Sequence, residues 1–433
     1  MSKLTSKIND LIKSNPSVYG KEDNYTPMYE SGIDLLDYRN GFLNTVTDDE
    51  RIGLMGGKVT TFIGGSGSGK TTLAIQAAAK IVEKYENSSV IHYDFEDATT
   101  DERIYQVTGW SKEMKQEKYT KLNKKISLDS VDQLIRGIRD TKLENEEEFT
   151  IHTDKIDPET GEKVSFMAPT VVIIDSVATM ASKEIDDKDG EGGQMNATKQ
   201  AKDNTTFIKR IIGSSTLNSA NIMLILINHI TTKIDINPYA ATPKELNYLK
   251  QGEALPGGKA INYMANNMFK ISPSQALDPE GNSNQAKYGI KGFINTVEVI
   301  KSRSNAAGAK FDLIFEQKNG FNNALSNLLF LQSEKMLKGN PRAYRIDGYD
   351  DVSFTLKTFM DKYESNKDFK EYFDNYVKGI YKEKFLANIE HESSLDNEEL
   401  ELVELVNKYE DIWLGSDGNY YDSDKNAIEV SKD

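Results

Sequence analysis

The sequence predicts an α/β fold whose centre is a mostly parallel, twisted sheet flanked by helices. In the first half of the chain, short apolar runs rich in β-branched residues alternate with stretches of helical character, and this alternation is typical of parallel sheets. A glycine-rich loop joins the first run to the first long helix. The 433 residues exceed the roughly 250–300 residues that one hydrophobic core serves, so we expect smaller appended regions as well.

Four apolar runs are the candidate strands of this sheet. Each is short and almost wholly apolar, as in strands that are buried on both faces. They are VTTFI (Val59–Ile63), VIHYDF (Val90–Phe95), VVIID (Val171–Asp175) and IMLILIN (Ile222–Asn228). The helical segments Thr71–Tyr85 and Ala197–Ile212 lie between them in sequence and are expected to flank the sheet.

The remaining elements interrupt or extend this pattern. Between Trp110 and Pro169, a helix over Asp129–Leu143 precedes FTIHT and VSFMA, which are predicted to form a β-hairpin around the turn DPETGEK. The polar segment after Ser272 is predicted to be a loop. Two further strand candidates, GFINTVEVIKSR and AKFDLIFEQ, flank a turn of small residues, and the chain beyond Ser333 is helical and acidic.

This organisation divides the chain into three regions. Residues 1–30 form an N-terminal helical arm, which either caps the core or docks on a neighbouring subunit. Residues 31–332 form the core, with an insertion at about 110–169. Residues 333–433 form a mainly helical C-terminal region, and its acidic tail from about residue 386 holds fourteen acidic against three basic residues.

Composition limits the function classes. With 38% hydrophobic and 28% charged residues, the chain resembles globular proteins rather than disordered ones. No apolar run approaches the ~20 residues that span a bilayer, so we expect a cytoplasmic protein without a membrane partner. Cysteine is absent and the four histidines lack metal-ligand spacing, so any metal is expected on oxygen ligands. The net charge of −15 argues against general polyanion binding, although the body outside the tail is nearly neutral.

A phosphate-binding loop is the strongest motif. Residues 64–71, GGSGSGKT, match G-x-x-x-x-G-K-[ST] between a buried strand and a helix. Glycines let backbone N–H groups fold around phosphate, and the helix N-terminus adds a positive dipole end. Lys70 is expected to reach the β- and γ-phosphates and Thr71 to ligate Mg²⁺. The expected nucleotide-binding residues of this segment are Gly64, Gly65, Ser66, Gly67, Ser68, Gly69, Lys70, Thr71 and Thr72.

Three charged side chains complete the candidate site. Asp175 ends the VVIID run, so its carboxylate is expected at the carboxyl edge of the sheet, where it can hold Mg²⁺ or a water bound to that ion. Glu96 follows VIHYDF and is placed either to activate the attacking water or to cap a helix. Arg103 either stacks its guanidinium on adenine or forms a surface salt bridge.

The order of the motifs resembles the core of RecA-like DNA recombinases over roughly residues 31–331. The elements are GGKVTTFIGGSGSGKTTLA, YDFED, VVIIDSVATMASKE, LILINHITTK, LPGGKAINYMAN and VEVIKSR, in that order. Of these, VVIIDSVATMASKE and VEVIKSR are especially similar to the bacteriophage UvsX-type branch. The resemblance implies a RecA-like P-loop ATPase core with ATP and Mg²⁺ as cofactors.

The resemblance also implies roles for individual residues. Glu96 is the catalytic carboxylate, with Lys70 beside it, and Asn228 and His229 sense the γ-phosphate and pass its state to a DNA-binding loop. A neutral imidazole at position 229, where bacterial relatives commonly carry glutamine, can still donate one hydrogen bond.

Lys301 and Arg303 match a basic pair that, in RecA filaments, crosses the subunit boundary and neutralises transition-state charge. The alternative for this pair is two exposed basic residues after a strand.

Two polar loops, at about residues 182–200 and 231–259, are expected to contact DNA. The second interleaves lysine with tyrosine, which suits phosphate neutralisation and base stacking. The first is rich in acids, so its contacts are expected from lysines that follow it. The candidate DNA-binding residues are Lys199, Lys202, Lys233, Lys244, Lys250, Gly257, Gly258 and Lys259. The acidic tail either competes with DNA for these loops or only solubilises the chain.

These features predict a DNA-dependent ATPase that forms filaments on single-stranded DNA and exchanges strands with duplex DNA. Its processes are homologous recombination and recombination-dependent repair or replication. Single-strand-binding and loader proteins are expected partners, and the location is the host cytoplasm if the chain is phage-encoded. The alternatives are a ring-forming hexameric replicative helicase with the same core fold and a non-catalytic mediator that uses ATP only to assemble; Glu96 argues against the mediator.

Overall fold

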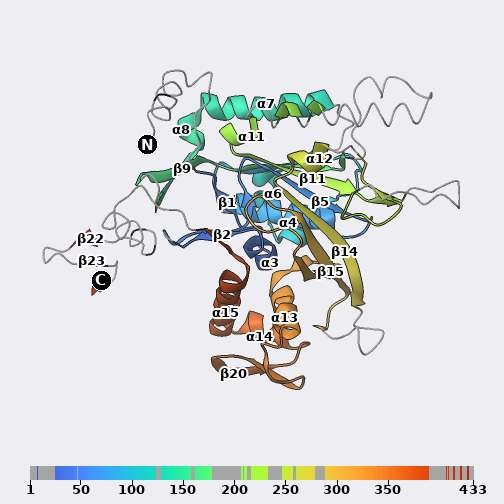
Figure 1. Ribbon diagram of the computed structural model, residues 1–433, viewed down its shortest axis with the longest axis vertical. Coiled ribbons are helices and arrows are strands. Elements are labelled where there is room, and N and C mark those ends of the chain that lie inside the picture. The colour runs from blue at the N-terminus through green and yellow to red at the C-terminus, as the bar shows by residue number, and fades with distance from the viewer. Residues whose placement is uncertain are drawn as a thin grey trace.

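The computed structural model describes most of the chain, with gaps. Described are residues 25–45, 47–122, 128–157, 161–177, 206–207, 209–211, 216–232, 246–256, 260–277 and 288–389, and isolated positions elsewhere. At its centre is a nine-stranded sheet with the order β17-β16-β15-β14-β5-β11-β10-β6-β7 (Figure 1). The strands are β5 (Val59–Gly64), β6 (Ser89–Asp94), β7 (Tyr119–Leu122), β10 (Thr170–Asp175), β11 (Ile222–His229), β14 (Asn267–Leu277), β15 (Gly292–Lys301), β16 (Lys310–Glu316) and β17 (Gly320–Asn322).

The parallel half of the sheet contains the four predicted strands. Neighbouring strands from β14 through β5, β11, β10 and β6 to β7 are all parallel. Asp175 at the end of β10 pairs with Ile227 on one side and Asp94 on the other. The carboxyl ends of these strands therefore form one edge, as the predicted α/β fold requires. Strands β15, β16 and β17 extend the sheet in antiparallel fashion.

Helices cover both faces of the sheet, and alternate residues of the strands separate into two hydrophobic clusters. Ile173 of β10 packs in the cluster that contains α4 (Lys70–Glu83) and α3 (Asp34–Tyr38). Its neighbour Ile174 packs in the other cluster, with α7 (Leu128–Glu144). Figure 1 shows α7 along one side of the sheet and α3 and α4 on the other. The remaining short helices are α5 (Asp101–Thr108), α6 (Lys112–Lys118), α8 (Glu146–Phe149), α11 (Thr216–Ser219) and α12 (Ala260–Met264).

Two stretches of the main sheet differ from the prediction. Tyr119–Leu122, inside the predicted insertion, is the edge strand β7 beside β6. The segment from Ser272, predicted to be a loop, continues β14 as far as Leu277. Strand β14 pairs with β5 only up to Ile271, and beyond that residue β15 is its one neighbour among the described strands. Because one side of β14 is unpaired at Pro273, the missing N–H of that proline is tolerated. Residues typical of loops can therefore occupy this part of the strand.

Small sheets surround the centre. The predicted hairpin is present as the antiparallel pair β8 and β9. The C-terminal region contains short strands that the sequence did not predict, because they carry few apolar residues in a row. The bounds are β1 (Met28–Tyr29), β2 (Phe42–Asn44), β3 (Asp49–Arg51), β4 (Leu54–Met55), β8 (Thr150–Ile156), β9 (Lys163–Met167), β12 (Thr231–Thr232), β13 (Glu253–Ala254), β18 (Lys338–Asn340), β19 (Ala343–Ile346), β20 (Tyr349–Phe354), β21 (Ala387–Ile389), β22 (Trp413–Leu414), β23 (Tyr420–Tyr421) and β24 (Ala427–Ile428).

The C-terminal region packs directly on the core. It contains α14 (Phe359–Ser365) and α15 (Lys367–Phe385), which follow α13 (Asn323–Ser333) below the sheet in Figure 1. Tyr381 of α15 is fully buried, and its ring contacts that of Phe330 edge to face, with ring centroids 4.9 Å apart. Its hydroxyl donates a hydrogen bond of 3.0 Å to Asn327 Oδ1. Strand β21 then pairs in parallel with β2. Among the described residues, no helix has both the length and the apolar character that a membrane crossing requires.

Candidate nucleotide site

The phosphate-binding loop lies between β5 and α4, as its motif predicts. Gly67 and Gly69 adopt the left-handed conformation, with φ of 71° and 85°, which glycine reaches without steric cost. A Cβ at Gly64 would lie 2.3 Å from the Ile271 carbonyl oxygen of β14, so only glycine fits there. Residues 65–67 are exposed and Ser68 is buried, which leaves the outer loop open to a ligand.

Lys70 lies at the first position of α4 with its side chain folded into the loop. Its Nζ donates hydrogen bonds to Gly65 O at 2.6 Å and to Ser68 Oγ at 3.4 Å. Burial lowers the pKa of Lys70 to about 8. The ammonium group is thus held inside the loop that the motif assigns to phosphate, where a phosphate oxygen would exchange with its carbonyl partner.

The two predicted Mg²⁺ residues are in contact. Thr71 Oγ1 donates a hydrogen bond of 2.5 Å to Asp175 Oδ2, although 104 residues separate them in sequence. Burial raises the pKa of Asp175 to about 6. The other carboxylate oxygen, Oδ1, is buried and has no hydrogen-bond partner among the described residues. A hydroxyl and a carboxylate with an unpaired oxygen are hard oxygen donors of the kind that Mg²⁺ prefers, so the pair fits that ion.

Glu96 and His229 meet across the same edge. His229 ends β11, Glu96 follows β6, and His229 Nε2 lies 2.9 Å from Glu96 Oε1. Burial, followed by the charge of Lys70, lowers the pKa of His229, so its imidazole is neutral at pH 7. One ligand atom from each of Glu96, Asp175 and His229 lies within 4.8 Å of the others. A catalytic carboxylate, a metal carboxylate and a neutral imidazole therefore converge beside the loop.

Two residues that the sequence analysis missed hold the turn that carries Glu96. The Asp94 carboxylate accepts hydrogen bonds from the backbone N–H groups of Ala98 at 3.2 Å and Thr99 at 2.9 Å. Lys121 of the unpredicted strand β7 donates to Thr99 O at 2.5 Å. Only the sheet order brings β7 beside β6, so no local pattern marked Lys121; the acid-rich YDFED run was the one available signal for Asp94.

Comparison with known proteins agrees with this geometry. Residues 51–208, a little over a third of the chain, match the family model of an AAA domain. The match and the loop between β5 and α4 together support a P-loop ATPase domain over these residues. No curated protein sequence matches the chain. The P-loop ATPase domain implies nucleotide binding, usually with Mg²⁺, and the loop, Thr71 and Asp175 are the residues placed for it.

Arg103 lies beside the first turn of α4, the helix that follows the phosphate-binding loop. Its guanidinium, on α5, donates to the carbonyl oxygens of Gln317 at 2.9 Å and Lys318 at 2.8 Å and to Thr72 Oγ1 at 3.3 Å. Its partners in the described structure are thus carbonyls and a hydroxyl, not the carboxylate of a salt bridge. Arg103 joins α4, α5 and the turn after β16, and its stacking on adenine stays a prediction.

Asn228 is fully buried at the end of β11, next to His229. Its Nδ2 donates to Pro256 O at 2.7 Å and its Oδ1 accepts from the backbone N–H of His229 at 2.9 Å. These contacts aim its side chain at the end of the second polar loop. Asn228 therefore connects His229 to Pro256 through two hydrogen bonds. Direct contact of Asn228 with the γ-phosphate stays a prediction.

Lys301 and Arg303 lie far from the phosphate-binding loop of their own chain. Asn295 of β15 donates to Ser68 O at 3.0 Å, and Lys301 follows six residues later, about 20 Å along the strand. Lys301 Nζ donates to the carbonyls of Asn262 at 3.0 Å and Tyr263 at 2.8 Å at the end of α12. Arg303 approaches the same Tyr263 carbonyl at 3.4 Å. The pair therefore lies at the opposite edge of the sheet from the phosphate-binding loop.

The loop that carries Arg303 is held by the rest of the chain. Ser302 Oγ donates to Asn40 Oδ1 at 2.8 Å, and Ser304 Oγ donates to Asn40 O at 2.5 Å. Asn305 Nδ2 donates to Gly41 O at 2.7 Å and to Phe385 O at 2.8 Å, at the end of α15. The basic pair is thus positioned jointly by the core and the C-terminal region.

The predicted DNA-binding residues are only partly described. Lys250 is exposed, and its backbone N–H donates to Glu253 Oε2 at 2.7 Å. Strands β12 and β13 pair antiparallel, so the second loop leaves and returns along one stem that starts directly after His229. Lying outside the described residues are Lys199, Lys202, Lys233, Lys244, Gly257, Gly258 and Lys259.

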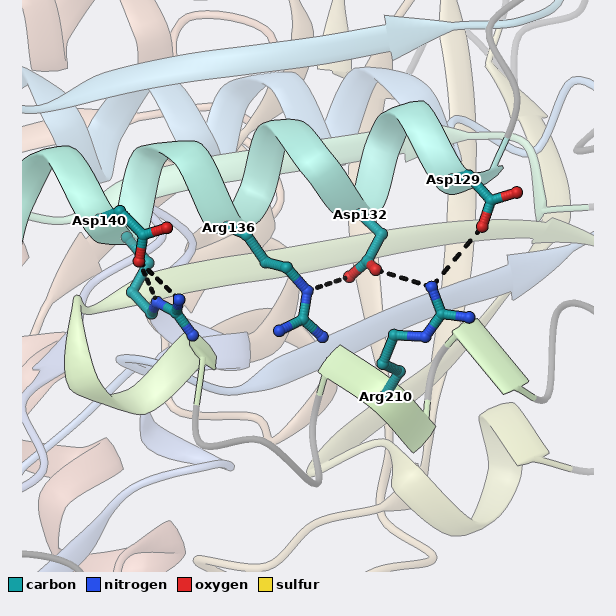
Figure 2. Close-up of polar contacts among 6 residues, drawn as sticks. Asp129, Asp132, Arg136, Asp140 and Arg210 are labelled. Carbon is teal, nitrogen blue, oxygen red and sulfur yellow. Dashed lines mark hydrogen bonds and ion pairs between the residues drawn. The ribbon is translucent and has the colours of Figure 1, made fainter. Parts of the chain in front are cut away.

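An ion-pair network holds the segment that follows the first polar loop. Arg210 Nη1 lies 2.9 Å from Asp132 Oδ2 and 3.6 Å from Asp129 Oδ1 on α7. Arg136 lies 3.0 Å from the other oxygen of Asp132, and Figure 2 shows the two guanidinium groups on either side of this carboxylate. Helix α7 of the predicted insertion therefore anchors the chain at Arg210, about ten residues after the first candidate DNA loop.

Proposed function

We propose that this chain is an ATP-dependent DNA strand-exchange protein of the RecA-like, UvsX-type group that forms filaments on single-stranded DNA. One observation carries the proposal. Lys301 and Arg303, the basic pair expected at the transferring phosphate, lie about 20 Å along β15 from the residue that touches the chain's own phosphate-binding loop. Their role requires a second copy of the chain, and head-to-tail repetition of one interface produces rings or helical filaments.

The residues suggest how hydrolysis would proceed. Lys70 and the backbone of the loop bind the phosphates of ATP, and Thr71 and Asp175 hold the ion. Mg²⁺, when bound, neutralises charge on the phosphate oxygens. Glu96 orients and deprotonates the attacking water, because its carboxylate is partly exposed at the open edge of the site. The neighbouring copy's basic pair stabilises the charge that develops on the phosphoryl group.

The same edge offers a path from the nucleotide to DNA. His229 is separated from β12 by a single residue, and Asn228 donates a hydrogen bond to Pro256 O at the far end of the same loop. A change in the position of His229 on phosphate binding would therefore move both ends of the stem. Lysines and tyrosines on this loop bind the DNA backbone and stack on bases without reading sequence, so base pairing between strands identifies homology.

Electron microscopy of the protein with single-stranded DNA and a non-hydrolysable ATP analogue tests the proposal. We expect extended helical filaments, and we expect the filaments to exchange a strand with a homologous duplex when ATP is supplied. Closed rings that unwind a forked duplex without a homologous strand would instead assign a replicative helicase. Assembly with ATP but no DNA-stimulated hydrolysis would assign a non-catalytic mediator.

A further inference from the structure

We propose that Glu96, Asp175 and His229 form a binding site for a divalent transition-metal ion, such as Mn²⁺, in the nucleotide-free protein. This proposal does not rest on strand exchange, because it concerns only three side chains of one copy. It goes beyond the Mg²⁺ role of Thr71 and Asp175, since it adds a nitrogen ligand and a second carboxylate.

The geometry of the three ligand atoms suits a single ion. They lie within 4.8 Å of one another, and His229 Nε2 is 2.9 Å from Glu96 Oε1. Ligand atoms about 2.1 Å from a metal ion lie about 3–4 Å apart, so small side-chain adjustments complete the site. The three residues lie at the ends of β6, β10 and β11, which are adjacent in the sheet, and the rigid register holds them in place.

An unsatisfied buried oxygen points independently to a ligand. Asp175 is 4% exposed, and its Oδ2 accepts from Thr71. Its Oδ1 has no hydrogen-bond partner within the described part of the chain. A buried polar atom without a partner is costly, and a cation that binds Asp175 through Oδ1 would remove this cost.

The donor types determine which ion is preferred. Mg²⁺ favours an all-oxygen octahedral shell and keeps several of its waters. An imidazole nitrogen suits transition ions such as Fe²⁺, Ni²⁺ and Zn²⁺, and Mn²⁺ is the member of that series that also favours carboxylate ligands. The Lys70 ammonium nearby opposes a cation, but the two carboxylates outweigh its single charge. An ion held here would occupy Glu96, and it would therefore block the carboxylate that hydrolysis requires until nucleotide binding displaces it.

The test is electron paramagnetic resonance of Mn²⁺ added to untagged, nucleotide-free protein. We expect one bound Mn²⁺ whose electron spin-echo signal shows modulation from a ¹⁴N nucleus, and a tenfold excess of Mg²⁺ does not displace it. The background is low because the chain has no cysteine and four histidines. The variant His229→Gln is expected to lose the nitrogen modulation and to weaken binding by at least tenfold.

Two further variants make the result decisive. His152→Gln is the matched control, because His152 is exposed and belongs to the separate β8–β9 hairpin instead of the central sheet. The Mn²⁺ signal of this variant should equal that of the wild type. Glu96→Gln should weaken binding while retaining the nitrogen modulation, and its circular dichroism should match the wild type. Nitrogen modulation that persists in His229→Gln, or its absence in the wild type, would overturn the proposal.

Discussion

The two ends of strand β15 differ in what they contact. Near one end, Asn295 reaches Ser68 of the phosphate-binding loop, beside which Thr71 pairs with Asp175 and His229 lies against Glu96. At the other end, Lys301 donates hydrogen bonds to carbonyls at the end of α12. One edge of the sheet carries the phosphate-binding loop with the candidate nucleotide site, and the other carries the basic pair Lys301 and Arg303. This difference is the basis of our proposal that hydrolysis depends on how copies of the chain associate.

The largest effect is expected at the edge that binds nucleotide. Glu96→Gln removes the general base, and we expect the DNA-stimulated ATPase rate to fall by about 10²–10⁴-fold while the affinity for ATP is retained. Glu102→Gln, on the exposed face of α5, is the control and should keep the wild-type rate. Equal rates for Glu96→Gln and the wild type would remove Glu96 from the mechanism.

The opposite edge is tested by mixing variants. We expect the double variant Lys301→Ala with Arg303→Ala to lose on the order of 10³-fold in kcat, as for an arginine that acts from a neighbouring subunit. Mixed with Glu96→Gln protein, it should regain activity above the sum of the two, because an intact pocket then faces an intact basic pair. Lys310→Ala, an exposed lysine of β16, is the control. Mixtures that stay inactive would contradict action between copies.

A smaller effect is expected where Lys121 holds the Glu96 turn. Lys121→Met removes the donor to Thr99 O, and the resulting displacement of Glu96 should lower kcat by about ten- to a hundredfold. The Kd for ATP should not change, because Lys121 does not touch the phosphate-binding loop. Lys121→Arg should restore most of the rate, and a matching loss of ATP affinity would indicate general damage instead of a positioning role.

Asp175, the expected Mg²⁺ ligand, should make nucleotide binding depend on pH. Burial raises the pKa of Asp175 to about 6, so its carboxylate is protonated below that pH and cannot ligate a cation. We expect Mg²⁺-dependent binding of a fluorescent ATP analogue to weaken several-fold between pH 7 and pH 5.5. In Asp175→Asn this change should shrink to the part caused by titration of ATP itself. Identical pH profiles for the two proteins would refute the assignment.

The smallest effect concerns stability on the face covered by α7. Lys142 donates to Ala168 O and Ala220 O, and burial lowers its pKa to about 7. Between pH 7 and 10 the unfolded chain binds this proton more tightly than the folded one, so stability rises with pH. Lys142→Met lacks this gain. The difference between its Tm and the wild-type Tm should therefore become more negative by a few degrees from pH 6 to pH 10. Lys318→Met, an exposed control, should show a constant difference.

The sequence by itself determined the local elements. The phosphate-binding loop, the four buried strands and the helix after Gly69 depend on residue types that lie side by side in the chain, so periodicity and glycine spacing were sufficient to predict them. Strand β7 and the extension of β14 were missed, because each owes its conformation to a neighbouring strand rather than to its own composition.

Only the tertiary structure decided which side chains meet. Thr71 contacts Asp175, and His229 lies against Glu96, because parallel strands distant in sequence end at one edge in the order β11-β10-β6. Asn228, one residue before His229, is turned away and buried, since successive side chains of a strand point to opposite faces. Sheet order and strand direction are long-range properties, and they are the reason why Lys301 lies beyond the reach of its own chain's phosphate-binding loop.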